Sequence, residues 1–150
     1  MSSYNKYLIT KAESEKPILN RVRKFKFIIM GYGGFVNIKN QTADLIQVQT
    51  NGAKCMNASG TWNEELIPNG GTYPRQYIEA SASFPSCMDT NSSLNFVLAK
   101  LDTSTGKYIP MGSFELYERM NNWSVENAST DIKFSTSKPG DQEIIDITLT

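Results

Sequence analysis

The chain alternates apolar and polar residues, with a period of two, in several stretches after residue 33. The alternation runs through FVNIKN at 35–40 and IQVQ at 46–49, and it returns in SLNFVL at 93–98. Successive side chains of a β-strand point to opposite faces, so this period is typical of strands with one buried and one solvated face. A membrane-spanning helix would need about 18 consecutive apolar residues, and the sequence has no such window.

A glycine-rich stretch, GYGG at 31–34, follows the apolar run FKFIIM at 25–30. A dinucleotide-binding fingerprint needs a third glycine where this chain has Val36, and a helix whose N-terminus receives the pyrophosphate. The alternating residues that follow predict a strand in place of that helix. We therefore expect a turn or bulge between strands, in which glycine supplies a positive φ, and no nucleotide site.

Turn-forming residues divide the rest of the chain into short strands. The stretches 69–71, 102–106 and 137–141 are rich in Gly, Pro, Asn or Ser, and strands separated in this way at about 8–12 residues predict a sandwich or barrel. The expected fold is all-β, a single-domain antiparallel β-sandwich. Pro74, near the start of one strand, suggests that this strand lies at a sheet edge.

The N-terminal segment differs from the rest in charge. Residues 1–26 carry seven Lys or Arg and two Glu, a net charge of +5, whereas residues 27–150 carry eight bases and thirteen acids, a net charge of −5. We therefore predict a basic segment at 1–24 and a β-sandwich domain at 25–150. Residues 17–23 have a helical pattern, which allows a short basic amphipathic helix, whereas 24–30 favours a strand.

A basic segment ahead of an acidic body is attracted either to an anionic surface or to that body. The residues predicted to bind an anionic membrane are Arg21, Arg23, Lys24 and Lys26. No conventional secretory signal is visible, so the sequence indicates a cytoplasmic protein or one exported by another route.

The chain has no histidine, which removes the commonest metal ligand and every Ser–His or Cys–His nucleophile. Its two cysteines, Cys55 and Cys87, are too few for a structural zinc site; they form either one disulfide or two small buried apolar side chains. Glu143 and Asp146 have opposite parity in the last strand, so they are not expected to share a cleft as an acid–base pair. We predict a non-enzymatic protein with no cofactor, no metal and no nucleic-acid partner.

Aromatic residues supply the candidate binding residues. Trp and Tyr combine an apolar ring with a polar group, so they suit sugar rings and lipid headgroups, although many such residues fill a core. Trp123 lies in the polar stretch MNNWSVEN, and we predict that it is exposed and binds a ligand together with Asn121 and Asn122. Three further ligand-binding candidates are Trp62, Tyr73 and Tyr77.

The order of several segments resembles the aegerolysins, small one-domain β-sandwich proteins that bind membrane lipids and often act with a pore-forming partner. The similar segments are VNIKN at 36–40, LIPNGGTYPRQYIEASAS at 66–83, SLNFVLAKLDTSTGKY at 93–108, NWSVEN at 122–127 and IIDITL at 144–149. The chain departs from the family by having FELYERMNN at 114–122 in place of a Trp-Asp-Cys-Pro-Trp stretch, and by its basic N-terminal segment. That segment ahead of a β-sandwich is similar in outline to the actinoporin cytolysins. Because of these departures, no binding residue of either family is transferred to this chain.

These observations predict a non-enzymatic binding protein that acts at membrane or cell surfaces, with membrane lipid as its first expected ligand. A lectin or adhesion module that binds glycan through Trp123 is the alternative. A third hypothesis is a structural protein that forms homo-oligomers by pairing the edge strands of two copies.

Overall fold

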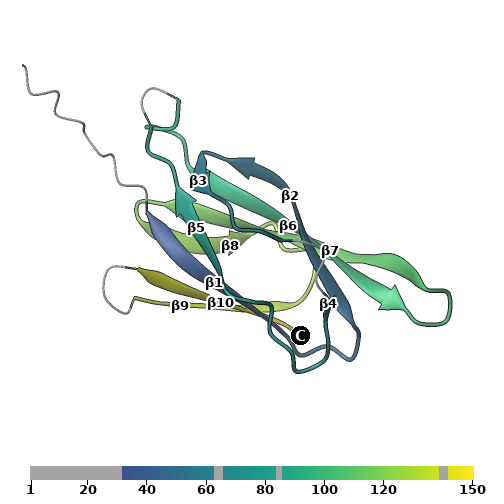
Figure 1. Cartoon of the computed structure of the whole chain (residues 1–150). Coiled ribbons are helices and arrows are strands. Elements are labelled where there is room, and N and C mark those ends of the chain that lie inside the picture. Colours follow the sequence, from purple (N-terminus) through teal and green to yellow (C-terminus); the bar gives the residue numbers. More distant parts are fainter. Residues whose placement is uncertain (1–31, 63–65, 84–85, 139–141) are drawn as a thin grey trace, which may run out of the picture.

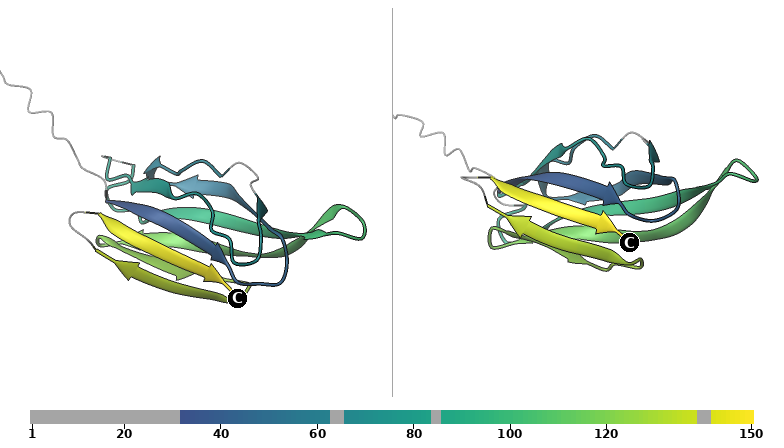
Figure 2. Two further views of the ribbon diagram at one scale, coloured as in Figure 1. Left: turned by 60° about the horizontal axis from the view of Figure 1, so that its bottom comes forward. Right: turned by 90° about the horizontal axis from the view of Figure 1, so that it is seen from below.

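The computed structural model of the chain describes residues 32–62, 66–83, 86–138 and 142–150. These residues form two five-stranded β-sheets that are stacked face to face, so the predicted all-β sandwich is confirmed (Figure 1, Figure 2). The predicted helix at 17–23 and strand at 24–30 lie outside the described residues.

The first sheet has the strand order β3-β5-β1-β10-β9. Its strands are β1 (Gly33–Asn40), β3 (Met56–Ala58), β5 (Gln76–Ala80), β9 (Ile132–Ser137) and β10 (Glu143–Leu149). The second sheet has the order β4-β2-β6-β7-β8. Its strands are β2 (Ile46–Lys54), β4 (Leu66–Ile67), β6 (Ser92–Asp102), β7 (Lys107–Arg119) and β8 (Asn122–Glu126).

The core lies between the two sheets and is built from alternate residues of each strand. In β6 the inward residues Leu94, Phe96 and Leu98 are fully buried, as the period of two predicts. Phe96 stacks on Phe114 of β7 at a centroid distance of 4.8 Å. The same rule separates Glu143, which is buried, from Asp146, which is exposed on the other face of β10.

The two sheets are mainly antiparallel, as predicted, with one exception in the first sheet. β1 and β10 pair in parallel, with Asn37 opposite Asp146. A parallel pair needs a long connection, and here the connection contains all the remaining strands. Pro74 does not mark an edge strand, because it precedes β5, which lies between β3 and β1.

A disulfide joins Cys55 to Cys87, with Cα atoms 5.6 Å apart. Of the two alternatives that the sequence left open, the structure therefore has the bonded one. The bond ties the junction of β2 and β3 to the segment that precedes β6.

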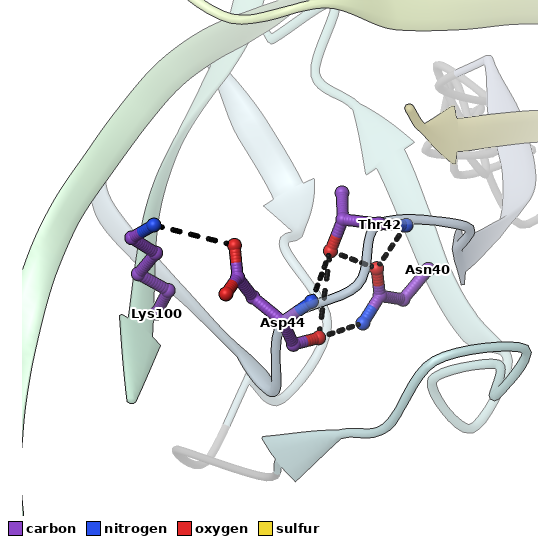
Figure 3. A network of polar contacts seen from close by, with 4 residues as sticks. All are labelled: Asn40, Thr42, Asp44 and Lys100. Atoms are coloured by element: carbon purple, nitrogen blue, oxygen red, sulfur yellow. Dashed lines mark hydrogen bonds and ion pairs between the residues drawn. The ribbon is translucent and has the colours of Figure 1, made fainter. Parts of the chain in front are cut away.

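The connection between β1 and β2 is held by the buried side chain of Asn40 (Figure 3). Its Nδ2 donates to the carbonyl oxygens of Asp44 and Ile67, both at 2.8 Å, and its Oδ1 accepts from the backbone and hydroxyl of Thr42. Lys100 of β6 pairs with Asp44 at 3.3 Å. Because its amide is buried and fully used, Asn40 is not available to carry a glycan, although it lies in an Asn-x-Thr sequence.

Candidate functional site

Three of the four aromatic residues predicted to bind a ligand belong to the core. Trp62, Tyr73 and Trp123 are 7%, 3% and 3% exposed. Trp62 lies edge-on to Phe96 and tilted against Tyr73, with centroids 4.8 and 5.0 Å apart. These residues are therefore packing residues, and the prediction that they present rings to a ligand is wrong.

Trp123 shows why the polar neighbourhood was misleading. Asn121 and Asn122 are exposed at the turn between β7 and β8, where Asn121 has a positive φ of 60°. Trp123 is the next residue of β8 and points inward, because successive side chains alternate between faces. The structure therefore does not bring the indole and the two amides together on one surface.

The fourth aromatic candidate, Tyr77, does lie on the surface. It belongs to the outer face of β5, since its neighbours Ile78 and Ala80 are buried. Phe35, directly opposite on β1, faces outward too, and the two ring centroids are 5.3 Å apart with a tilt of 57°. The two partly exposed rings form an aromatic surface on the outside of the first sheet.

Gly33 provides the place where the Tyr77 ring rests. A Cβ atom at Gly33 would lie 2.9 Å from Cε2 and from Cζ of Tyr77, closer than real Cβ contacts come. Gly33 and Gly34 are strand residues without a positive φ, so the predicted turn or bulge is wrong at these two positions. The glycine at 33 is explained by the close approach of the Tyr77 ring, which leaves no room for a Cβ atom at this position.

The hydroxyl of Tyr77 is fixed as well. It donates to Oε2 of Glu79 at 2.6 Å, while Asn57 donates to Oε1 of the same carboxylate at 2.8 Å. The hydrogen bond to Glu79, together with burial and the negative charge of Glu79, raises the pKa of Tyr77 to about 12. The hydrogen bond from Tyr77, followed by that from Asn57, lowers the pKa of Glu79. Both groups therefore stay in the protonation states that hold the ring in place at neutral pH.

A row of polar side chains runs beside the aromatic pair. Arg75 donates from Nε to Oδ1 of Asn37 at 2.9 Å, and Asn37 donates from Nδ2 to Oδ1 of Asp146 at 2.8 Å. The guanidinium of Arg75 lies 6.0 Å from the centroid of Phe35. We call the five residues Phe35, Asn37, Arg75, Tyr77 and Asp146 the outer-face site.

A shallow hollow of about 350 Å³ opens at the polar side of the outer-face site. This volume is within the range of about 300–1,000 Å³ that is usual for small-molecule sites. The residues that border it are Asn37, Lys39, Thr72, Arg75, Asp146, Ile147 and Thr148. Among these described residues Asp146 is the one carboxylate. The arrangement offers stacking and hydrogen bonding, which are means of binding.

A second exposed feature is the end of the β6–β7 hairpin, which projects beyond the other strands of the sandwich (Figure 2). Tyr108 and Ile109 are 46% and 41% exposed there. They face opposite sides of the hairpin, opposite Leu101 and Lys100 of β6. Asp102 fixes the polar end of the hairpin by accepting hydrogen bonds from Ser104 and Thr105, and these bonds lower its pKa to about 2.

The other predicted sites are not part of the described structure. Arg21, Arg23, Lys24 and Lys26 lie outside the described residues, so their role in binding an anionic membrane stays a prediction. Among the residues that the structure describes, no helix is long and apolar enough to span a bilayer, and no three His, Cys, Asp or Glu side chains are grouped for a metal ion.

Comparisons with protein-family models and with curated proteins find no match for this chain. The resemblance to the aegerolysins therefore stays a prediction.

Sequence reasoning found Tyr77 but missed the other four residues of the outer-face site. Phe35 and Asn37 follow the outward parity of β1, and Asp146 follows that of β10. Parity was therefore visible in the sequence. The parallel pairing that places Asn37 beside Asp146 was not visible, because 109 residues separate them.

Proposed function

We propose that this protein is a non-enzymatic binding protein of membrane or cell surfaces that recognises carbohydrate through the outer-face site. The observation that carries the proposal is the partly exposed Tyr77 ring, which lies against Gly33 and next to Phe35, with the Arg75–Asn37–Asp146 row at its side. This part of the lectin hypothesis is kept, with Tyr77 in the place that Trp123 was expected to take.

The chemistry of a sugar matches both halves of this site. One face of a pyranose ring presents C–H groups, which pack against the electron-rich face of an aromatic ring. Its hydroxyls both donate and accept hydrogen bonds, so they are matched by a carboxylate, an amide and a guanidinium. Asn37, Arg75 and Asp146 are already oriented by their mutual bonds, so binding needs little ordering of side chains.

The Cys55–Cys87 disulfide supports action outside the cytosol. Disulfides persist in oxidising environments and are rare where thiols are kept reduced. A protein that meets cell-surface glycans works in such an environment, so the cysteine pair and the proposed ligand are compatible.

A glycan array tests the proposal with three proteins: the wild type, Tyr77→Ala and Tyr108→Ala. Tyr108 is the matched control, because it is an exposed tyrosine on the hairpin and not part of the outer-face site. We expect the wild type and Tyr108→Ala to bind the same glycans and Tyr77→Ala to lose them. Equal binding by all three proteins, or binding by none, would contradict the proposal.

Tyr77→Phe separates the ring from its hydroxyl. The hydroxyl is used by Glu79, so the proposed role of Tyr77 is stacking. Tyr77→Phe should therefore keep most of the glycan signal that Tyr77→Ala loses. A loss as large as that of Tyr77→Ala would assign the hydroxyl, and not the ring, to the ligand.

Lipid binding is the second candidate function, and the hairpin favours it. Tyr108 and Ile109 are exposed, and Lys107 lies next to Tyr108 at the start of β7. Tyr at a membrane interface places its ring among the lipid chains and its hydroxyl in the headgroups, and Lys is attracted to anionic lipid. The basic residues predicted at 21–26 would add to this attraction.

Flotation with vesicles of phosphatidylserine and phosphatidylcholine at low salt tests lipid binding. We expect the wild type to float and the double variant Tyr108→Ser, Ile109→Ser to float less. Loss of flotation only when Arg21, Arg23, Lys24 and Lys26 are all replaced by Gln would assign the binding to the basic segment alone. No flotation of the wild type would reject lipid binding.

A further inference from the structure

We propose that the ligand of the outer-face site is an acidic saccharide, one whose sugar ring carries a carboxylate or a sulfate. This inference rests on the proposed carbohydrate binding and adds the charge of the ligand to it. Its basis is an excess of positive charge around the hollow, on a body whose net charge is negative.

Two cations and one anion border the hollow. Arg75 and Lys39 carry positive charge and Asp146 carries negative charge, so the net charge of the border is 2 − 1 = +1. Residues 32–150 contain eight Lys or Arg and thirteen Asp or Glu, a net charge of 8 − 13 = −5. A positively charged site attracts anions from solution, whereas the rest of this negatively charged protein repels them.

The two cations are not neutralised by carboxylates of the described structure. The one ion pair among the described residues joins Lys100 to Asp44, in another part of the molecule. Arg75 uses Nε to bind Asn37, and this bond orients the guanidinium while leaving its terminal nitrogens for a ligand. A guanidinium presented in this way matches a carboxylate or sulfate through two parallel hydrogen bonds.

Alternate residues of β1 set the spacing of the site. Phe35, Asn37 and Lys39 all point outward, and alternate residues of a strand are roughly 6.7 Å apart. Along this line the aromatic pair comes first, the Asn37–Asp146 pair second and Lys39 third, opposite Thr148 of β10. A sugar ring stacked on Tyr77 and Phe35 would therefore direct its next substituent over Asn37 and towards Arg75 and Lys39.

Isothermal titration with lactose, sialyllactose and sulfated lactose tests the inference, because the three probes share one neutral parent. We expect the two acidic probes to bind more tightly than lactose by about tenfold, the factor that corresponds to one charge-assisted hydrogen bond. The preference should shrink as salt is added, since salt screens exposed charges. Lactose binding as tightly as its acidic derivatives would overturn the inference and leave the proposed carbohydrate binding standing.

Substitutions of Lys39 and Arg75 test whether these two cations cause the preference for acidic probes. Lys39→Met and Arg75→Met should each bring acidic and neutral probes closer in affinity, whereas Lys107→Met, on the distant hairpin, should not. Arg75→Lys keeps the charge but loses the paired hydrogen bonds, so it should lose part of the preference. Tyr77→Ala should weaken neutral and acidic probes alike. An unchanged preference in both Lys39→Met and Arg75→Met would overturn the inference, provided that both variants melt at the wild-type temperature.

The anionic group can come from a free glycan or from a lipid headgroup, and vesicles distinguish the two sources. The wild type should bind vesicles that display a sialylated glycolipid, and free sialyllactose should reduce this binding. Sialyllactose should not reduce binding of the wild type to phosphatidylserine vesicles that carry no sugar. If sialyllactose did reduce binding to the phosphatidylserine vesicles, the site would recognise negative charge alone, which would contradict the saccharide part of the inference.

Discussion

Tyr77 lies directly over Gly33, so a Cβ atom at residue 33 would meet ring carbons Cε2 and Cζ at 2.9 Å. The glycine and the tyrosine are therefore one structural unit. We expect Gly33→Ala to displace the ring, to lower the free energy of unfolding by about 1–3 kcal/mol, as overpacking does, and to weaken glycan binding.

Gly52→Ala is the matched control for Gly33→Ala, because Gly52 is also a strand glycine and nothing lies within 4 Å of its Cβ position. Urea unfolding measures both variants. The double variant Gly33→Ala, Tyr77→Ala removes the clash, so its loss of unfolding free energy should be smaller than the sum of the losses in the two single variants. A loss equal to that sum would show that the ring and the glycine do not interact.

The Tyr77–Glu79 hydrogen bond predicts an unusual tyrosine titration. The pKa of Tyr77 is raised from 10.0 to about 12, chiefly by this hydrogen bond. A raised tyrosine pKa stabilises the fold below pH 10, and this contribution is lost as the pH rises from 10 to about 12. Ultraviolet absorbance of tyrosinate, taken as the difference between the wild type and Tyr77→Phe, should show this late titration. In Glu79→Gln it should shift to lower pH; no shift would mean that Glu79 is not the cause.

Substitution by Phe is predicted to destabilise the fold by different amounts at Trp123 and at Trp62. The indole N–H of Trp123 is buried without a hydrogen-bond partner among the described residues, whereas that of Trp62 donates to the carbonyl of Ser59 at 2.8 Å. An unsatisfied buried donor costs about 1–3 kcal/mol. Trp123→Phe removes that cost and should destabilise less than Trp62→Phe in urea unfolding, and it should leave glycan binding unchanged. A larger loss in Trp123→Phe would indicate that its N–H has a partner such as a bound water.

The Cys55–Cys87 disulfide closes a loop over a sequence separation of 32 residues. In the chain-entropy account a loop of this length stabilises the fold by about 3–4 kcal/mol. The double variant Cys55→Ser, Cys87→Ser should unfold at a lower urea concentration than the wild type. A reducing agent should lower the melting temperature of the wild type and leave that of the double variant unchanged. Equal sensitivity of the two proteins would count against the bond.

The raised pKa of Glu118 predicts that the free energy of unfolding depends on pH in the acidic range. Burial raises its pKa above the usual 4.5, the charge of Glu143 adds to the rise, and the N–H of Asn121 opposes it. The folded state therefore takes up this proton at a higher pH than the unfolded state, so the contribution of Glu118 to stability increases as the pH falls through the raised pKa. Glu118→Gln should be more stable than the wild type at neutral pH, and the difference should shrink as the pH falls through the raised pKa and be lost below pH 4.5. Glu126→Gln, at an exposed position of β8, is the control for the loss of one carboxylate from the same sheet.

The sequence by itself determined the all-β class, and it assigned the faces of the long strands. Leu94, Phe96 and Leu98 are buried together in β6, and Glu143 and Asp146 lie on opposite faces of β10. These predictions succeed because strand periodicity is local: a residue's face follows from its parity relative to a few apolar neighbours.

Only the tertiary structure decided which strands lie side by side and which side chains therefore come together. The parallel pairing of β1 with β10 brings Asn37 to Asp146, although 109 residues separate them. The position of β5 beside β1 places Tyr77 over Gly33, and the start of β8 at Asn122 turns Trp123 into the core. Parity does not determine these arrangements, because the pairing of distant strands depends on how the ten strands of the described residues together bury their apolar faces.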